Sequence, residues 1–340
     1  MQFLYKINIA NLGIHDSDYR EYLRDLYSSS LAPDNWTHKD IDFFYDGQRY
    51  QVSIDWKTAI IDIKDHVDKA MFIDEAFQLY EEAEGYSSLQ EFLEDQVVNH
   101  KSKSSFSLIV ETTENNEKKV DQVIFNLSQH IFLVANLSCP GIVDFYAATL
   151  TPNNEDLKLS KHTFEESLTE SFYRGWPQMG SIPFNITFEW YNKLGVWSKD
   201  IAATSIEKAL FAIMSYCAEE KLNPSRLIWI AHAIEALYET PHSGIVNSLR
   251  ERIAIFLDIV EKKEFKKKLN DFYEYRSKFV HGGLPIAIPS IDFFDEAHGH
   301  YFNKLFEVER FGLAIIIATL QKLILSNWTK ITFSTTYTGE

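Results

Sequence analysis

Two residues that together could handle a phosphate, Arg276 and His281, stand five residues apart in the stretch YEYRSKFVHGG. Apolar residues recur at helical spacings through this segment and predict a buried stripe: Phe265, Leu269, Phe272 and Phe279. Arg276 falls within this stripe, where an aliphatic residue would be usual. Because a buried guanidinium without a partner costs several kcal/mol, we expect an anion beside it, either a carboxylate of this chain or the phosphate of a ligand.

His281 directly precedes Gly282 and Gly283, so we expect it in the last turn of a helix that ends at the glycines. The negative end of the helix dipole favours a protonated imidazole at that position. A histidine that titrates near neutrality beside a fixed cation suits RNA cleavage. The imidazole can move the proton of the 2′-OH while the guanidinium stabilises charge on the phosphate.

An upstream segment, RLIWIAHAIEALYET, supplies a carboxylate for this pair. The segment is apolar nearly all round, which predicts a central, buried helix. Its exceptions share one face at spacings of 3 and 4: His232, Glu235 and Glu239. Glu235 is the candidate to hold Arg276 or to orient the histidine, and the alternative is a structural salt bridge in the core. For His232 the favoured interpretation is a core histidine with satisfied hydrogen bonds.

Three stretches, taken in order, resemble the Apea-like branch of the HEPN superfamily: RLIWIAHAIEALYET, SLRERIAIFL and YEYRSKFVHGG. That branch has an A-x-E-A-L helix, an R-x-A helix and a helix end of the form Y-x-x-R-S-x-x-V-H-G. Arg276 and His281 match the R-x4-H motif of the superfamily, and Ser277 occupies its small polar position. Arg252, in the middle stretch, and His232 are predicted to support the site.

The resemblance covers about residues 195–330, and it implies an all-α bundle that cleaves RNA without a metal or another cofactor. Members act as homodimers in which the motifs of both protomers face each other, and many are toxins or effectors in bacterial defence against phage. We therefore expect a homodimer, and the alternative is that the apolar surface of the first and last helices packs only within the bundle. The residues expected at the interface are Phe211, Met214, Phe302, Phe306 and Phe311. Other members do not cut RNA and serve as binding or dimerisation modules, which is the alternative for this chain.

The elements that must position these residues fall into two groups. Residues 1–190 indicate a mixed α/β domain and residues 195–330 a helical domain, so the predicted class is α+β. Strand-like runs in the first domain lie at 3–9, 49–63, 106–110, 131–137 and 184–190, and helical spacing at 67–83 and 89–98. Five predicted helices follow, at about 199–220, 224–240, 245–260, 262–281 and 292–326. Their short connections favour an antiparallel bundle.

The charge of the chain is uneven. Its net charge is −16, of which −15 lies in residues 1–200 and −1 in residues 201–340. This acidity argues against simple electrostatic attraction of the whole chain to nucleic acid. The segment 246–281 nevertheless carries +3, and its lysines form either a solvated helix face or a basic surface beside the motif: Lys262, Lys263, Lys266, Lys267 and Lys268. We expect the acidic first domain to sense or regulate, with a protein or a phage component as its trigger.

The start of the chain lacks a basic stretch followed by an apolar run, and its longest apolar stretch, 311–320, is half the length that crosses a bilayer. Two cysteines, Cys139 and Cys217, cannot form a disulfide framework. These features predict a cytoplasmic protein that does not bind membranes.

Two groups of residues resemble metal sites, and we expect neither to hold a metal. One stands at the start of a predicted helix, where the helix dipole explains acidic residues: Asp295, Glu296, His298 and His300. The other, Asp55 with Asp62 and Lys64, loosely resembles the D…(D/E)xK pattern of metal-dependent nucleases. The gap between its members is short, and a solvated strand face explains them better.

Overall fold

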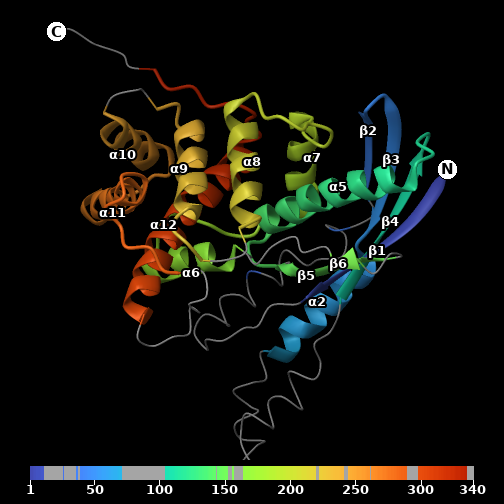
Figure 1. Ribbon diagram of the computed structural model, residues 1–340, viewed down its shortest axis with the longest axis horizontal. Helices are drawn as coiled ribbons and strands as arrows, with labels where there is room; N and C mark the ends of the chain where they lie inside the picture. The colour runs from blue at the N-terminus through green and yellow to red at the C-terminus, as the bar shows by residue number, and fades with distance from the viewer. Residues whose placement is uncertain are drawn as a thin grey trace, which may run out of the picture. The chain divides into compact units, whose positions relative to one another are not determined.

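The computed structural model describes residues 1–10, 26, 36, 39–70, 104–142, 144–151, 155–156, 164–219, 222–240, 244–260, 262–288 and 298–334. The chain divides into two compact units (Figure 1), Met1–Thr163 with Gly180–Glu189, and Phe164–Met179 with Trp190–Glu340. The first unit contains an antiparallel sheet and the second is built from helices, so the α+β class is confirmed. The predicted boundary near residue 190 misplaces segment 164–179, because its helix packs within the second unit.

Six strands form the sheet of the first unit, in the order β2-β3-β4-β1-β5-β6 with antiparallel neighbours. Their bounds are β1 Gln2–Ala10, β2 Lys39–Tyr45, β3 Gln48–Asp55, β4 Ser104–Thr112, β5 Asp144–Thr151 and β6 Glu155–Asp156. The helices of this unit include α2 Lys57–Ala70 and α5 Glu117–Ser138. Asp46 and Gly47 join β2 to β3 with φ of 48° and 75°, as a tight hairpin turn requires.

The core of the first unit lies between the sheet and α5. The ring of Phe106 on β4 stacks on Trp56 with 4.3 Å between centroids and meets Phe132 of α5 edge-on. At the other end of the helix, the hydroxyl of Tyr5 on β1 donates a hydrogen bond to Asp121 at 2.7 Å. Aromatic packing and this hydrogen bond therefore hold α5 against the sheet.

Two of the expected strands are helical. Residues 131–137 lie within α5, and residues 184–190 open α7, Phe184–Leu194. All residues from 131 to 138 are buried. Residues 131–137 are nearly all apolar and buried on every side, so they show no periodicity that separates a helix from a strand. The strand prediction for this run was wrong for that reason.

The strand predictions at 3–9 and 106–110 are confirmed, whereas the run at 49–63 is a strand only as far as Asp55 and its residues 57–63 lie in α2. Residues 3–9 lie within β1 and residues 106–110 within β4, while the alternation at Val52 and Ile54 belongs to β3. The chain leaves β3 at Asp55, two residues before α2 begins. Of the helical spacing at 67–83 and 89–98, only residues 67–70 lie among the described residues, as the end of α2.

The helices of the second unit are α6 Glu165–Arg174, α8 Ser205–Cys217, α9 Arg226–Leu237, α10 Ile245–Phe256, α11 Lys262–Val280 and α12 Gly299–Ser326, with the end of α7. The five predicted helices correspond to α8 to α12 with shorter bounds. α12 is the central one, since residues 311–321 are all buried and the helix packs against α6, α9 and α11. α8 packs along α9, and α10 packs on α11 (Figure 1).

A buried group of charges joins four of these helices. Arg226 of α9 is 1% exposed, and its Nη2 lies 2.6 Å from Glu309 Oε1 of α12. The hydroxyl of Tyr216 on α8 donates to the same carboxylate at 2.5 Å and accepts from Arg226 at 2.6 Å. Burial, with a smaller contribution from Glu309, raises the pKa of Glu166 on α6 to about 7. Each of these charges therefore depends on the other helices being in place.

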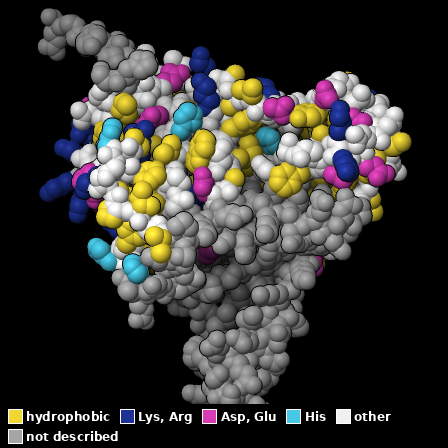
Figure 2. All heavy atoms as spheres, in the orientation of Figure 1, with side chains coloured by type: hydrophobic (Ala, Val, Ile, Leu, Met, Phe, Trp, Pro, Cys, Tyr) yellow, Lys and Arg dark blue, Asp and Glu magenta, His cyan; other side chains and the backbone are white. Residues whose placement is uncertain are grey.

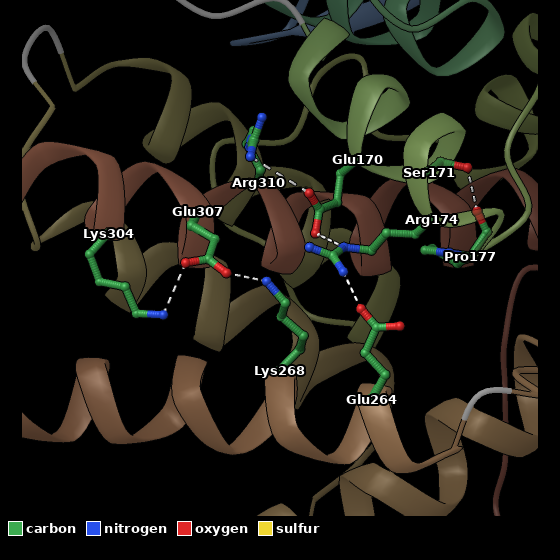
Figure 3. Close-up of polar contacts among 9 residues, drawn as sticks. All are labelled: Glu170, Ser171, Arg174, Pro177, Glu264, Lys268, Lys304, Glu307 and Arg310. Carbon is green, nitrogen blue, oxygen red and sulfur yellow. Dashed lines mark hydrogen bonds and ion pairs between the residues drawn. The ribbon is translucent and has the colours of Figure 1, made fainter. Parts of the chain in front are cut away.

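Ion pairs at the edge of the unit connect α6, α11 and α12 (Figure 3). Arg174 of α6 binds Glu170 of its own helix and Glu264 of α11. Glu307 of α12 binds Lys268 of α11 and, at 3.0 Å, Lys304 of α12. These pairs cover the first half of α11 along one side.

Gly312 marks the closest approach of α9, α11 and α12. A Cβ atom at this position would lie 2.5 Å from Cγ2 of Ile230 on α9 and 2.9 Å from Cε2 of Phe272 on α11. Both distances are shorter than carbon atoms tolerate, so only glycine allows the three helices to pack this tightly.

Replacing Gly312 with alanine tests this packing. We expect Gly312→Ala to lower the free energy of unfolding by about 1–3 kcal/mol, because overpacking outweighs the higher helix propensity of alanine. The measurement is the midpoint of denaturant unfolding at unchanged slope. Gly299→Ala, on the same helix but with no atom within 4 Å of the added Cβ, is the control and should not destabilise. Equal midpoints for the two variants would show that the helices do not depend on Gly312.

Candidate functional site

The second half of α11 places Arg276 against the bundle. The buried side of this helix carries Phe265, Leu269 and Phe272, and Arg276 follows on the same side, as the spacing predicted. Its residue is only partly buried, but its Nε atom is fully covered and has no hydrogen-bond partner among the described residues. Nε itself is out of reach of a ligand, but Arg276 has no ion pair with the described residues, so the other nitrogens of its guanidinium can still bind an anion.

His281 stands one residue beyond the end of α11 and is exposed. Its backbone N–H donates to the carbonyl of Ser277 at 3.0 Å, so the helical turn continues through it. Gly282 then takes φ of 74°, and the N–H of Gly283 donates to the carbonyl of Lys278 at 2.7 Å, which ends the helix in a left-handed turn. The glycines thus present the imidazole to solvent. Ser277 itself is half-buried, one residue after the arginine.

Glu235 of α9 faces Tyr273 of α11. Tyr273 is 8% exposed, and burial raises its pKa; the Glu235 carboxylate raises it further, while the charge of Arg276 lowers it. The three groups therefore share one electrostatic neighbourhood. Glu235 and Arg276 form no ion pair within 4.0 Å in the described structure, and the Tyr273 hydroxyl has no hydrogen bond of standard geometry there. Tyr273 had no role in the predicted site, although its position three residues before Arg276 was a usable signal.

The exposed face of α9 differs from the prediction. Ile228 and Trp229 remain 39% and 37% exposed, and His232 is exposed rather than part of the core. The helix is covered by α8, α11 and α12 on the rest of its circumference. The apolar composition of this segment predicted burial on all sides, but neighbouring helices of the unit do not surround it. His232 therefore lies in solvent, one turn before the half-buried Glu235.

Arg252 of α10 holds the end of α9. Its Nη1 donates to the carbonyls of Tyr238 at 2.6 Å and Glu239 at 2.5 Å, and its guanidinium lies 4.8 Å from the ring centroid of Phe333. The last carbonyls of a helix have no partner within the helix, and a cation satisfies them well. The described contacts of Arg252 thus stabilise the helix that carries Glu235.

The structure describes part of the two groups of residues that resemble metal sites. Asp55 ends β3 and accepts a hydrogen bond at 3.0 Å from the N–H of Lys57, the first residue of α2, whereas Asp62 and Lys64 lie within α2 and not on the expected strand face. His298 and His300 are exposed at the start of α12, and Asp295 and Glu296 lie outside the described residues. Within the described ranges, no three His, Cys, Asp or Glu side chains are grouped so that they could hold a metal ion.

The predicted dimer surface is partly wrong. Phe302 and Phe311 are buried inside the unit, where Phe311 packs near Trp176 and Phe265. They cannot also face a second protomer. Phe211, Met214 and Phe306 are half-buried.

No protein-family model matches the chain, and no curated protein or solved structure was found to be similar to it. The HEPN resemblance therefore rests on the motif residues alone. In the part of the chain that the structure describes, no helix is long and apolar enough to span a bilayer.

The contacts of Arg252 predict a loss of stability on its removal. We expect Arg252→Ala to lower the free energy of unfolding by about 1.5–3 kcal/mol, the range for hydrogen bonds to a charged group. Arg250→Ala is the matched control, because Arg250 lies on the same helix and has no hydrogen bond or ion pair with described residues. Thermal unfolding of both variants provides the comparison. A stable Arg252→Ala protein with impaired RNA cleavage would contradict the structural role and favour a direct one.

Proposed function

We propose that the chain is a metal-independent endoribonuclease of the HEPN type, with Arg276 and His281 as its reactive groups. The observation that carries the proposal is the state of Arg276: its guanidinium has no ion pair among the described residues, and it stands five residues before an exposed histidine at a helix end. A fixed cation beside a titratable imidazole is what cleavage of a phosphodiester by its own 2′-OH requires.

In the proposed reaction, His281 takes the proton of the 2′-OH and the 2′-oxygen attacks the adjacent phosphorus. The bond from phosphorus to the 5′-oxygen breaks, and that oxygen leaves with a proton. The products are a 2′,3′-cyclic phosphate and a 5′-hydroxyl. Arg276 stabilises the charge that gathers on the phosphate oxygens as the bond forms. The second proton transfer needs an acid, which His281 of a second protomer would supply in a two-fold dimer.

Glu235 and Tyr273 have a supporting part in this proposal. The Tyr273 hydroxyl is protonated at neutral pH, as an ordinary tyrosine is, and its raised pKa extends this to higher pH, so it can donate a hydrogen bond. Glu235 brings one negative charge near the guanidinium without pairing with it. The arginine therefore remains available to a phosphate, while a carboxylate nearby offsets part of the cost of burying its charge.

The alternative function is a HEPN module that binds or dimerises without cutting. Exposed apolar side chains close in sequence to the site favour it, since a partner could cover them: Ile228, Trp229, Val280, Ile286 and Ile288. The proposed role as a toxin or effector in antiphage defence, with the first unit as sensor, rests on the resemblance alone. Cleavage assays separate the two functions.

Incubation of the purified full chain with RNA in EDTA tests the proposed activity. We expect cleavage by the wild type, and a loss on the order of 10²–10⁴-fold in His281→Ala, because the imidazole is the only proposed base. Replacing an exposed residue should leave folding intact, which circular dichroism checks.

His300→Ala is the control, as this histidine is also exposed and lies on α12. Equal cleavage by the wild type and His281→Ala would end the proposal. Cleavage that EDTA abolishes and Mg²⁺ restores would instead direct attention to Asp55, Asp62 and Lys64.

A further inference from the structure

The solvent side of α11 carries a row of unpaired positive charge. Its lysine row, defined here as Lys262, Lys263, Lys266 and Lys267, is exposed at every position. Residues spaced three, four or seven apart lie on one face of a helix, so the same face continues from the lysine row through Asn270 and Ser277 to His281. Figure 2 shows Lys and Arg side chains gathered at the left margin of the molecule, where Figure 1 draws α10 and α11.

The acidic residues of α11 do not neutralise this row, because they are engaged elsewhere. Glu264 binds Arg174, and Glu274 binds Lys278 at 2.6 Å. Asp271 lies 3.8 Å from Lys304. The fifth lysine of the segment, Lys268, is itself paired with Glu307 (Figure 3). Within the described ranges, the lysine row and Arg276 are therefore the charges of α11 that lack an ion pair.

Two shallow hollows lie along the same helix. One is lined by Val260, which is 81% exposed, together with residues of the lysine row and Glu264. The other lies between α11 and the start of α10, and it is lined on the α11 side by Asn270, Tyr273 and Glu274. Positive charges with hollows beside them suit a chain of nucleotides, which presents both charged phosphates and flat bases. A membrane surface would need neither the hollows nor the polar side chains.

From this arrangement we infer that single-stranded RNA lies along α11, with its phosphates on the lysine row and its reactive phosphate at His281 on the same face. Arg276, about 140° around the helix from His281, would reach that phosphate from the buried side by the length of its side chain. At 1.5 Å per residue, Lys262 and His281 are about 28 Å apart along the axis. That length accommodates about eight nucleotides of a stacked strand at about 3.4 Å each, and fewer of an extended one. The inference deepens the proposed function, since it names the substrate as a strand that continues several nucleotides to one side of the cleaved bond.

Binding can be measured apart from cleavage. The ligand is a fluorescent ten-nucleotide RNA with 2′-O-methyl groups throughout, which cannot be cut by 2′-OH attack. Five phosphate contacts, four on the lysine row and one at Arg276, predict a slope of about −3.5 for log affinity against log salt, so the wild-type affinity should fall about a hundred-fold between 50 and 200 mM salt. A four-nucleotide RNA should bind more weakly and with a shallower slope, because it cannot span the lysine row and the motif.

Two quadruple variants of the full chain decide where the RNA binds. The first replaces the four residues of the lysine row with glutamine and should lose most of the salt dependence, because only the contact at Arg276 remains. The second replaces Lys57, Lys118, Lys208 and Lys330, which are also exposed, and should bind like the wild type. Both variants lose four positive charges and so make the net charge of −16 more negative by the same amount. Overall charge therefore cannot explain a difference between them.

Equal affinity of the two variants for RNA would overturn the inference, as would binding of vesicles rich in phosphatidylserine, but not RNA, through the lysine row. RNA binding through the lysine row by a wild type that never cleaves RNA would support the inference and reject the proposed ribonuclease. Cleavage with an unchanged KM in the lysine-row variant would support the ribonuclease and reject this path for its substrate.

Discussion

The helical unit depends on one buried arginine. Arg226 is almost without solvent contact, and it binds both the carboxylate of Glu309 and the hydroxyl of Tyr216. A charge in that position is tolerable only when its partners reach it, so α8, α9 and α12 must come together before any of them is stable. Removing one partner of such a group would leave a buried charge without its counter-charge, which is strongly destabilising.

The candidate site follows from this arrangement. With α9 fixed against α12, the absence of a side chain at Gly312 lets α11 approach both helices. That approach sets Tyr273 and Arg276 of α11 opposite Glu235 of α9. The end of α9 is held in turn by Arg252 through two backbone carbonyls. The chemistry proposed for the last turn of α11 thus depends on contacts that α9 makes with α12 and with Arg252 of α10.

How much the sequence could predict differed from element to element. α11 was predictable because its apolar residues recur on one face, whereas residues 131–137 of α5 are buried all round and carry no such signal. Arg276 and His281 could be singled out from their positions in the helix. The contacts of Arg252 could not, since backbone carbonyls leave no trace in a sequence. The exposure of Trp229 was equally hidden, because it depends on which helices happen not to cover that face.

The chemical nature of the cleaved ends tests the central claim most directly. Mass spectrometry of a defined oligoribonucleotide after incubation with the full chain would identify both ends of the cut. If His281 as the base and Arg276 beside the phosphate direct the 2′-OH at the adjacent phosphorus, the fragments end in a 2′,3′-cyclic phosphate and begin with a 5′-hydroxyl. Fragments with a 3′-hydroxyl and a 5′-phosphate would mean that water attacked the phosphorus, and would contradict the roles assigned to Arg276 and His281.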